Sequence, residues 1–273
     1  MLNKPIGLLD SGVGGLTVLK AVKDRLPNES FVYIGDTKRC PYGNRTKEEI
    51  ITFTLELVQF LLDQDVKMIV IACNTATAHA LEIVRSKVDV PVIGVVGPGS
   101  QAAVSTTGTK QIGVLATVST VESGFYEQSL LDKDKGVQVK SLACPEFVDI
   151  VEDNAYESAE ARQLVDDKLT GFKTPEMDTV ILGCTHFPLL APFIQEVLGP
   201  DVTLIDSGAL TSYEVESVLD ENKLEADEAK ERTIRIFTTG PVAMFRTIVE
   251  NWLETDQLDI KSIELERLKK TDD

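Results

Sequence analysis

Two of the four cysteines in this sequence, Cys73 and Cys184, have the surroundings that thiol chemistry needs. Each directly follows an apolar run, MIVIA or TVILG, of the kind that predicts a buried strand. Hydrogen-bonding residues follow both cysteines at once: Asn74, Thr75, Thr185 and His186. Because open α/β sheets bind ligands beyond the carboxyl ends of their strands, both thiols are predicted to lie at a ligand site.

Two opposed thiols can invert a stereocentre. If two similar halves of the chain face each other across a cleft, Cys73 and Cys184 approach one bound molecule from opposite sides. One thiolate then removes a proton while the other thiol donates a proton to the opposite face. A thiol with a pKa of about 8.5 is only partly ionised at neutral pH, so the attacking thiol needs help. The N-terminus of a following helix can supply it. The alternative is two core cysteines, because free cysteine is among the most buried residue types.

The polar residues beside the two thiols suit the carboxylate and ammonium groups of an amino acid better than an apolar ligand. His186, directly beyond Cys184, can change its charge near neutral pH and is therefore a candidate proton handler. We interpret the other histidine, His79, as structural.

The elements that must position these residues alternate between strands and helices. Apolar, β-branched runs predict strands at 6–10, 31–35, 68–72, 90–96, 111–117, 137–143, 179–184 and 202–206. Amphipathic spacing predicts helices at 16–26, 46–64, 76–87, 121–132, 146–153, 158–170 and 189–198. This alternation is typical of βαβ units with a parallel sheet.

The two halves of the chain resemble each other. Residues 6–9 match 112–115, residues 69–73 match 180–184, and residues 92–93 match 204–205, all at nearly the same offset. Buried parallel strands are generally rich in Val, Ile and Leu, but here the cysteines also fall in register. We interpret the pattern as a duplication. It predicts an α/β fold of two similar domains, each with a mainly parallel sheet flanked by helices, related by pseudo-twofold symmetry with the active site between them.

A domain boundary is predicted near residues 94–103, where glycine and proline cluster. Beyond about residue 207 the chain holds a predicted helix, a strand at 233–240 and a last helix, too little for a further domain. We therefore assign residues 1–97 with 208–265 to the first domain and residues 98–207 to the second. Residues 266–273 are predicted to be a charged, frayed tail. Cys40 and Cys144, which precede proline and have no counterpart in the repeat, are interpreted as structural.

The segment at residues 8–19 predicts a strand, a glycine-rich turn and a helix. Gly12 and Gly14 begin a G-x-G-x-x-G pattern of dinucleotide binding, but Thr17 occupies the third glycine position. A carboxylate at Asp10 would also oppose a pyrophosphate. The geometry suits a small substrate better, with Asp10 against its ammonium group or a neighbouring thiol and Ser11 against its carboxylate.

Composition narrows the classes of function further. The net charge of −17 argues against sequence-independent nucleic-acid binding, which depends on Lys and Arg. The sequence has no secretory signal and no apolar run near the length of about 20 residues that a membrane span needs. A cytoplasmic protein with reduced thiols is therefore expected. With two histidines and no C-x₂₋₄-C spacing, no metal site is expected.

Six segments spread from residue 10 to 208 resemble the signature segments of bacterial glutamate racemases, in the aspartate/glutamate racemase superfamily: DSGVGGLTVL, CPYGNR, ACNTATA, ATVSTVESGFY, GCTHFPLL and IDSG. The resemblance covers nearly the whole chain. It implies interconversion of L- and D-glutamate without a cofactor, which supplies D-glutamate for peptidoglycan biosynthesis. It also implies a small-molecule substrate, no nucleic-acid or membrane partner, and a homodimer as in many relatives. Some relatives respond to a cell-wall precursor through an N-terminal extension, which this chain is expected to lack.

The resemblance also implies roles for individual residues. Cys73 would act on D-glutamate and Cys184 on L-glutamate, with Asp10, Glu152 and His186 as assisting acid–base groups. From the residues alone, Glu152 is typical of a solvated helix position. The implied substrate contacts are Asp10, Ser11, Tyr42, Gly43, Asn74, Thr75, Thr117, Thr120, Thr185 and His186.

Two alternatives stay open. A racemase of aspartate or another amino acid would differ in its substrate alone. A nucleotide-binding oxidoreductase or a ligand-binding module built on the same α/β units would use the glycine-rich turn, with Asp36 as the ribose-binding acid. It would tolerate the substitution Cys73→Ala.

Overall fold

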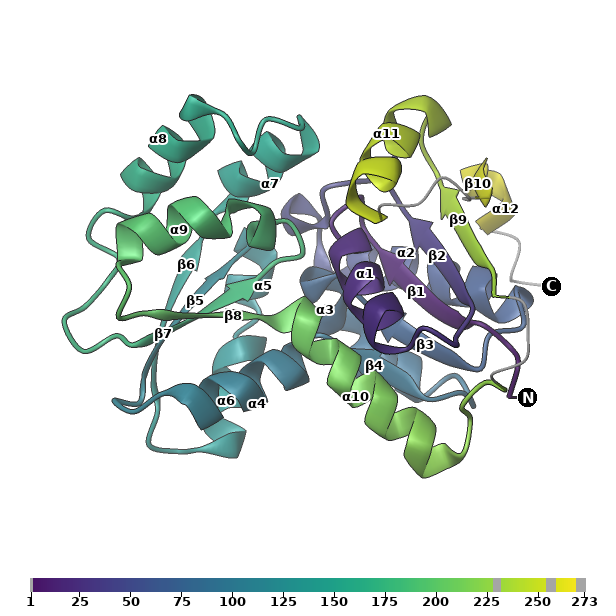
Figure 1. The fold of residues 1–273 in the computed structure, drawn as a ribbon, viewed down its shortest axis with the longest axis horizontal. Coiled ribbons are helices and arrows are strands. Elements are labelled where there is room, and N and C mark those ends of the chain that lie inside the picture. The colour runs from purple at the N-terminus through teal and green to yellow at the C-terminus, as the bar shows by residue number, and fades with distance from the viewer. Residues whose placement is uncertain (1, 228–231, 254–258, 269–273) are drawn as a thin grey trace.

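The computed structural model describes residues 2–227, 232–253 and 259–268, and it contains two parallel sheets with helices packed against them (Figure 1). The six-stranded sheet has the order β10-β9-β2-β1-β3-β4, and the four-stranded sheet has the order β6-β5-β7-β8. We call each sheet with the helices that cover it the first lobe and the second lobe, respectively. The predicted α/β fold of two similar halves is confirmed.

The strands of the first lobe are β1 (Ile6–Asp10), β2 (Phe31–Gly35), β3 (Met68–Ile71), β4 (Val92–Gly94), β9 (Ile234–Thr238) and β10 (Asp259–Ser262). Those of the second lobe are β5 (Gln111–Ala116), β6 (Gln138–Ala143), β7 (Thr179–Gly183) and β8 (Thr203–Asp206). The first helices are α1 (Leu16–Arg25), α2 (Lys47–Asp63), α3 (Asn74–Arg85), α4 (Val96–Thr106), α5 (Val118–Glu122) and α6 (Phe125–Lys133). The remaining helices are α7 (Pro145–Glu152), α8 (Ala159–Leu169), α9 (Ala191–Leu198), α10 (Ser207–Asn222), α11 (Val242–Leu253) and α12 (Leu265–Leu268), and the short 3₁₀ helices are η1 (Tyr42–Asn44) and η2 (Phe187–Leu190).

The two sheets share both strand order and register. Within β2-β1-β3-β4 and β6-β5-β7-β8, the strands follow one another in the same sequence of positions. Gly7 pairs with Ile69 in the first sheet, and Gly113 pairs with Val180 in the second. These are the pairs that the internal sequence match aligns. The structure therefore supports duplication of an α/β unit, with β3 and β7 as equivalent strands.

Several segments differ from the predicted elements. The single helix predicted at 121–132 is divided into α5 and α6, because Gly124 between them adopts a left-handed conformation (φ 66°). The glycine- and proline-rich segment at 94–103, where a domain boundary is predicted, lies largely within helix α4. Pro98 is tolerated there because it lies in the first turn, where a missing N–H costs no hydrogen bond. Strand β10 has one buried residue, Ile260, so it carries no apolar run that predicts it. Residues 266–268 of the expected frayed tail belong to α12, and Leu268 is buried; residues 269–273 lie outside the described residues.

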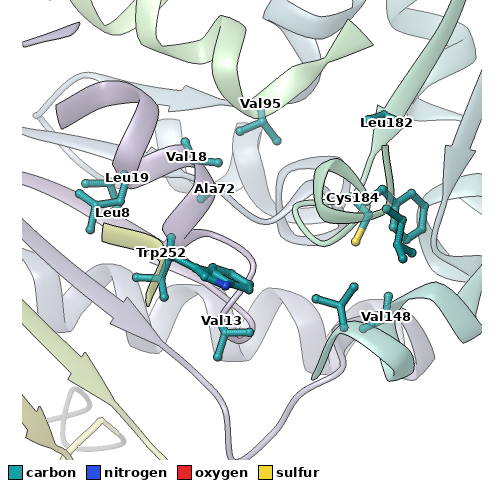
Figure 2. Close-up of a cluster of buried hydrophobic side chains, with 14 of the residues drawn as sticks. Leu8, Val13, Val18, Leu19, Ala72, Val95, Val148, Leu182, Cys184 and Trp252 are labelled. Carbon is teal, nitrogen blue, oxygen red and sulfur yellow. The ribbon is translucent and has the colours of Figure 1, made fainter. Parts of the chain in front are cut away.

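The largest hydrophobic cluster joins the two lobes. It includes Val13, Ala72 and Trp252 from the first lobe with Val148 and Cys184 from the second. Figure 2 shows the Cys184 sulfur directed into the space between these two groups. Helix α10, which follows β8, packs against α1 and α4 and so ties the second sheet to the first lobe. None of the helices in the described part of the chain has the length and apolar composition that a bilayer crossing requires.

A buried ion pair fastens the segment after α10 to the first lobe. The Lys67 ammonium lies 2.6 Å from the Glu29 carboxylate, and the two side chains are 1% and 4% exposed. Lys67 also donates to the carbonyl groups of Leu2 and Leu224, at 2.8 and 2.6 Å. One side chain thus connects the N-terminal residues, the loop before β2 and the segment that follows α10.

We expect the substitution Lys67→Met to lower the free energy of unfolding by about 3–5 kcal/mol, because it leaves the Glu29 charge buried without its partner. Equilibrium unfolding in urea measures the loss. Lys4→Met is the matched control: Lys4 pairs with Asp65 at 2.6 Å, but the side chains are 37% and 73% exposed, so the loss should stay below about 1 kcal/mol. Equal losses in the two variants would contradict this account of the buried pair.

Candidate active site

The residues singled out in the sequence gather at the carboxyl ends of β1, β3 and β7. Asp10 is the last residue of β1. Cys73 is the N-cap of α3, just after β3, and Cys184 directly follows β7. Parallel strands present their carboxyl ends at one edge of a sheet. The two lobes bring these edges together, so that a charge on Cys184 influences the pKa of Cys73.

Cys73 lies beside a negative charge. Its side chain is 5% exposed, donates to the Ser11 hydroxyl at 3.6 Å and accepts from the backbone N–H of Ala76 at 3.4 Å. Burial and the carboxylate of Asp10 raise the pKa of Cys73 to about 12, although the bonds from Ala76 and to Ser11 act in the opposite direction. The predicted support from a helix N-terminus is present, but burial and Asp10 outweigh it.

Cys184 lies beside a histidine. Its Sγ is 3.6 Å from His186 Nδ1, and His186 Nε2 is 2.5 Å from Glu152 Oε1. Burial lowers the pKa of His186, but the contacts with Cys184 and Glu152 outweigh burial and leave that pKa well above the usual value. Burial raises the pKa of Glu152, yet the hydrogen bond from His186 leaves it lowered. Both shifts favour an imidazolium paired with a carboxylate.

In the described part of the chain, no α-helix begins directly after Cys184, so this thiol lacks the α-helix N-terminus that the sequence predicts beside it. The segment after Cys184 forms the 3₁₀ helix η2, which contains Pro188, before α9 begins at Ala191. The two cysteines thus occupy equivalent strand positions but have different electrostatic partners. Cys73 has Asp10 and a helix N-terminus, whereas Cys184 has the His186–Glu152 pair.

Two buried polar atoms in this region make no hydrogen bond to the described part of the chain: Asp10 Oδ1 and Asn74 Nδ2. Asp10 is fully buried, and its other oxygen accepts from the backbone N–H of Gly12 at 2.9 Å. Burial raises the pKa of Asp10. Asn74 Oδ1 accepts from the Tyr126 hydroxyl at 2.6 Å, which fixes the amide with its nitrogen free. One free acceptor and one free donor match the ammonium and carboxylate groups of an amino acid.

Three threonines bring hydroxyl groups from both lobes together. Thr75 Oγ1 lies 2.9 Å from that of Thr117 and 3.1 Å from that of Thr120, and the last two are 3.0 Å apart. Thr117 also caps α5. Thr185, the other predicted threonine, lies across from the glycine-rich turn, and its carbonyl accepts from the Thr17 hydroxyl at 3.4 Å.

The glycine-rich turn is shaped by contact with the second lobe. A Cβ atom at Gly14 would lie 2.3 Å from Thr185 Oγ1 and 2.7 Å from His186 Nδ1. Any side chain there would force the lobes apart. This close approach of the two lobes explains why glycine is needed at the turn, so a bound pyrophosphate is not required to explain it.

The structure turns the Tyr42 hydroxyl away from the predicted substrate contacts. It donates to Asp36 Oδ2 at 2.6 Å, and the side chain is buried. Asp36 also accepts from Arg39 and Thr239, so this carboxylate anchors the loop instead of facing a ribose. Gly43, the next residue, packs directly against Thr117. A substrate contact at Tyr42 would have to come from its backbone.

Several neighbours of the site were not predicted. Cys40, interpreted as structural, has its Sγ 3.7 Å from Glu152 Oε1. The Tyr33 hydroxyl donates to the Gly12 carbonyl at 2.8 Å. Both lie in or just after β2, and no pattern in the sequence indicates that they face residues more than a hundred positions away or a turn on another strand. Cys144 is buried in the hydrophobic cluster that joins the lobes, as a structural cysteine would be.

His79 bridges the lobes outside the cluster of predicted residues. Its Nε2 lies 2.8 Å from the Ser119 hydroxyl of α5. Among the residues that the structure describes, no group of His, Cys, Asp and Glu side chains could hold a metal ion. Over the same residues the four cysteines are free thiols.

Comparisons with known proteins identify the class. Residues 16–212 match the profile of the Asp/Glu/Hydantoin racemase family. A glutamate racemase of Lactococcus lactis is 51% identical over 270 residues, which cover 99% of both chains. A solved glutamate racemase isoform of Bacillus anthracis superposes with a TM-score of 0.93 at 42% identity, covering 97% of this chain and 99% of that one. A glutamate racemase of Francisella tularensis, solved in complex with D-glutamate, gives 0.90 at 35%, covering 97% and 99%.

The fold and the matched profile define an amino-acid racemase, an isomerase. Within that class, the chain belongs to the glutamate racemase family.

The two histidines should titrate on opposite sides of the usual histidine pKa of about 6.5. Burial lowers the pKa of His79, whereas that of His186 is raised. A pH titration of the two imidazole signals by NMR measures both midpoints. In a Glu152→Gln variant the His186 midpoint should fall by about 1 unit or more, because the imidazolium loses its carboxylate, while that of His79 stays in place.

The raised pKa of His186 also determines how its contribution to the stability of the fold changes with pH. A raised folded pKa means that His186 stabilises the fold fully below about pH 6.5 and loses this contribution as the pH rises through the folded value. A His186 midpoint at or below that of His79 would contradict the ion pair.

Proposed function

We propose that this protein is a cofactor-independent glutamate racemase that interconverts L- and D-glutamate with two cysteine bases. The observation that carries the proposal is the placement of Cys73 and Cys184 directly beyond the equivalent strands β3 and β7, buried at 5% and 7% exposure and close enough to interact electrostatically. Relatives named as glutamate racemases along the whole length of the chain support the choice of substrate.

An amino acid fits the free polar atoms of the site. Its ammonium group would bind Asp10 Oδ1, and its α-carboxylate would accept from Asn74 Nδ2, two buried atoms of this region that lack a hydrogen-bond partner among the described residues. The hydroxyls of Thr75, Thr117 and Thr120 can rotate to donate to a second carboxylate. This arrangement supports a dicarboxylic amino acid as substrate.

The reaction from D-glutamate begins at Cys73. Its thiolate removes the α-proton, and the Cys184 thiol donates a proton to the opposite face of the carbon, which yields L-glutamate. Burial and Asp10 raise the pKa of Cys73 to about 12, so the thiol form predominates at neutral pH. An ammonium group bound to Asp10 would offset the negative charge that raises this pKa, so substrate binding itself would favour the thiolate.

The reaction from L-glutamate begins at Cys184. His186 Nδ1 lies 3.6 Å from the Cys184 sulfur, and Glu152 accepts a hydrogen bond from His186 Nε2 on the far side of the ring. The α-proton of an amino-acid carboxylate is very weakly acidic, so the developing carbanion needs preorganised donors in a site from which water is excluded. The buried thiols indicate a closed arrangement, and the lobes must separate to admit substrate and release product.

The alternatives receive less support. A nucleotide-binding module needs Asp36 free for a ribose, whereas Asp36 is buried and bonded to Arg39, Tyr42 and Thr239. A racemase of aspartate would use the same thiols, and an assay on both amino acids separates the two substrates.

The wider setting of the reaction is part of the proposal. D-glutamate would supply peptidoglycan biosynthesis in the cytoplasm, where reduced cysteines persist. We propose a first domain of residues 1–97 with 208–265 and a second of 98–207, and a homodimer as in many relatives. Both assignments follow the sequence pattern and the resemblance.

Racemisation followed by circular dichroism tests the substrate and the bases together. The wild-type protein should convert either enantiomer of glutamate to the racemate and act far more slowly on aspartate. Cys73→Ala and Cys184→Ala should each lose at least about a hundredfold in rate, because each removes a proton-transfer group. Cys144→Ala, in the hydrophobic cluster, should retain the rate. Glutamate racemisation that survives either of the first two substitutions would rule out the two-cysteine assignment.

A further inference from the structure

Glu152 belongs to the second lobe but is held in part by the first. It ends α7, and its Oε1 atom lies 2.5 Å from His186 Nε2 in the same lobe. The same oxygen accepts from the Cys40 thiol at 3.7 Å, and the backbone N–H of Val13 also donates to the carboxylate. Both of these donors come from loops of the first lobe.

The contact between Cys40 and Glu152 depends on space at the glycine-rich turn. A Cβ atom at Gly12 would lie 2.7 Å from Glu152 Oε1 and 2.9 Å from Cys40 Sγ. The thiol and the carboxylate therefore meet above a residue that has no side chain. The loop that carries Cys40 is fixed in turn, because the Cys40 N–H donates to the Asp36 carbonyl at 3.1 Å.

Cys40 acts here as a neutral donor. Burial and the negative charge of Glu152 raise its pKa far above the usual range, so that it stays a thiol. The other ionisable groups that face Glu152 are His186, Asp10 and Tyr33, from the β7–η2 turn, β1 and β2. Of these, His186 alone can carry a positive charge, and the orientation of the carboxylate toward His186 depends on the donors that hold its oxygens.

We propose that Cys40 is a positioning residue: from the first lobe it holds the Glu152 carboxylate against His186, so that closure of the lobes completes the acid–base pair beside Cys184. As an account of activity, this inference rests on the proposed racemase function. The approach of the two lobes then does more than enclose the substrate, because the groups that donate hydrogen bonds to Glu152 come from both lobes.

The test compares Cys40→Ala, Cys40→Val and Cys40→Ser with the wild-type protein. Alanine and valine remove the donor, valine with less loss of volume, whereas serine keeps a hydroxyl donor. Cys144→Ala is the matched control for a buried cysteine that contacts neither Glu152 nor His186. Two readouts are measured: the acidic limb of kcat/KM for glutamate against pH, and the NMR midpoint of His186.

Loss of the thiol donor should raise the pKa of Glu152. As the pH falls, the carboxylate would then be protonated, and the His186–Glu152 ion pair lost, at a higher pH than in the wild-type protein. We expect the acidic limb to move up by about 0.5 pH unit in the alanine and valine variants. At neutral pH, where Glu152 stays ionised, kcat/KM should fall about three- to tenfold because the carboxylate is no longer held in place against His186. The His186 midpoint should fall in the same variants. Serine should restore the limb and the midpoint toward the wild-type values, and Cys144→Ala should leave both unchanged.

Three results would overturn the inference: a limb and midpoint unchanged by alanine or valine, a serine variant as impaired as alanine, or an equal shift in Cys144→Ala. If Cys40→Ala does not fold, the valine and serine variants carry the comparison. Failure of the wild-type protein to racemise glutamate would instead reject the proposed function, and the His186 midpoint would still decide whether Cys40 positions Glu152.

Discussion

The hydrogen-bond register of β1, β3, β5 and β7 determines where the two thiols lie. In both sheets the third strand of the unit pairs with the first in the same alignment, so Cys73 and Cys184 emerge at equivalent heights. A shift of one residue in either pairing would turn every side chain of that strand to the other face. The glycine-rich turn, the threonine cluster and the shared hydrophobic core all depend on the approach of these two strand ends.

Equivalent backbone positions do not give equivalent chemistry. Burial and Asp10 raise the pKa of Cys73, whereas Cys184 lies beside the His186–Glu152 pair. The two halves thus differ in the side chains that surround the proposed substrate site. Such a difference suits a reaction whose two directions start from opposite faces of one carbon, because each base needs its own means of reaching the thiolate form.

The sequence predicted those elements whose burial produces a recognisable pattern of apolar residues. β1 and β2 have the predicted bounds because buried parallel strands are continuous apolar runs. Helix α4 was missed because Gly97 and Pro98 are typical of loops, and β10 because it buries one residue. Cys73, Cys184 and His186 were identified from their neighbours in sequence. Glu152 was identified by resemblance alone, and Cys40 was not assigned to the site, since their proximity arises from packing between lobes.

Transfer of deuterium from solvent tests the central claim, two bases on opposite faces, most directly. Unlabelled L-glutamate is incubated with the protein in D₂O, and both enantiomers are isolated early in the reaction. The account predicts D-glutamate with deuterium at its α-carbon from the first turnovers, while the remaining L-glutamate keeps its proton. D-glutamate without solvent deuterium, or an L-glutamate pool that exchanges as fast as product forms, would contradict it.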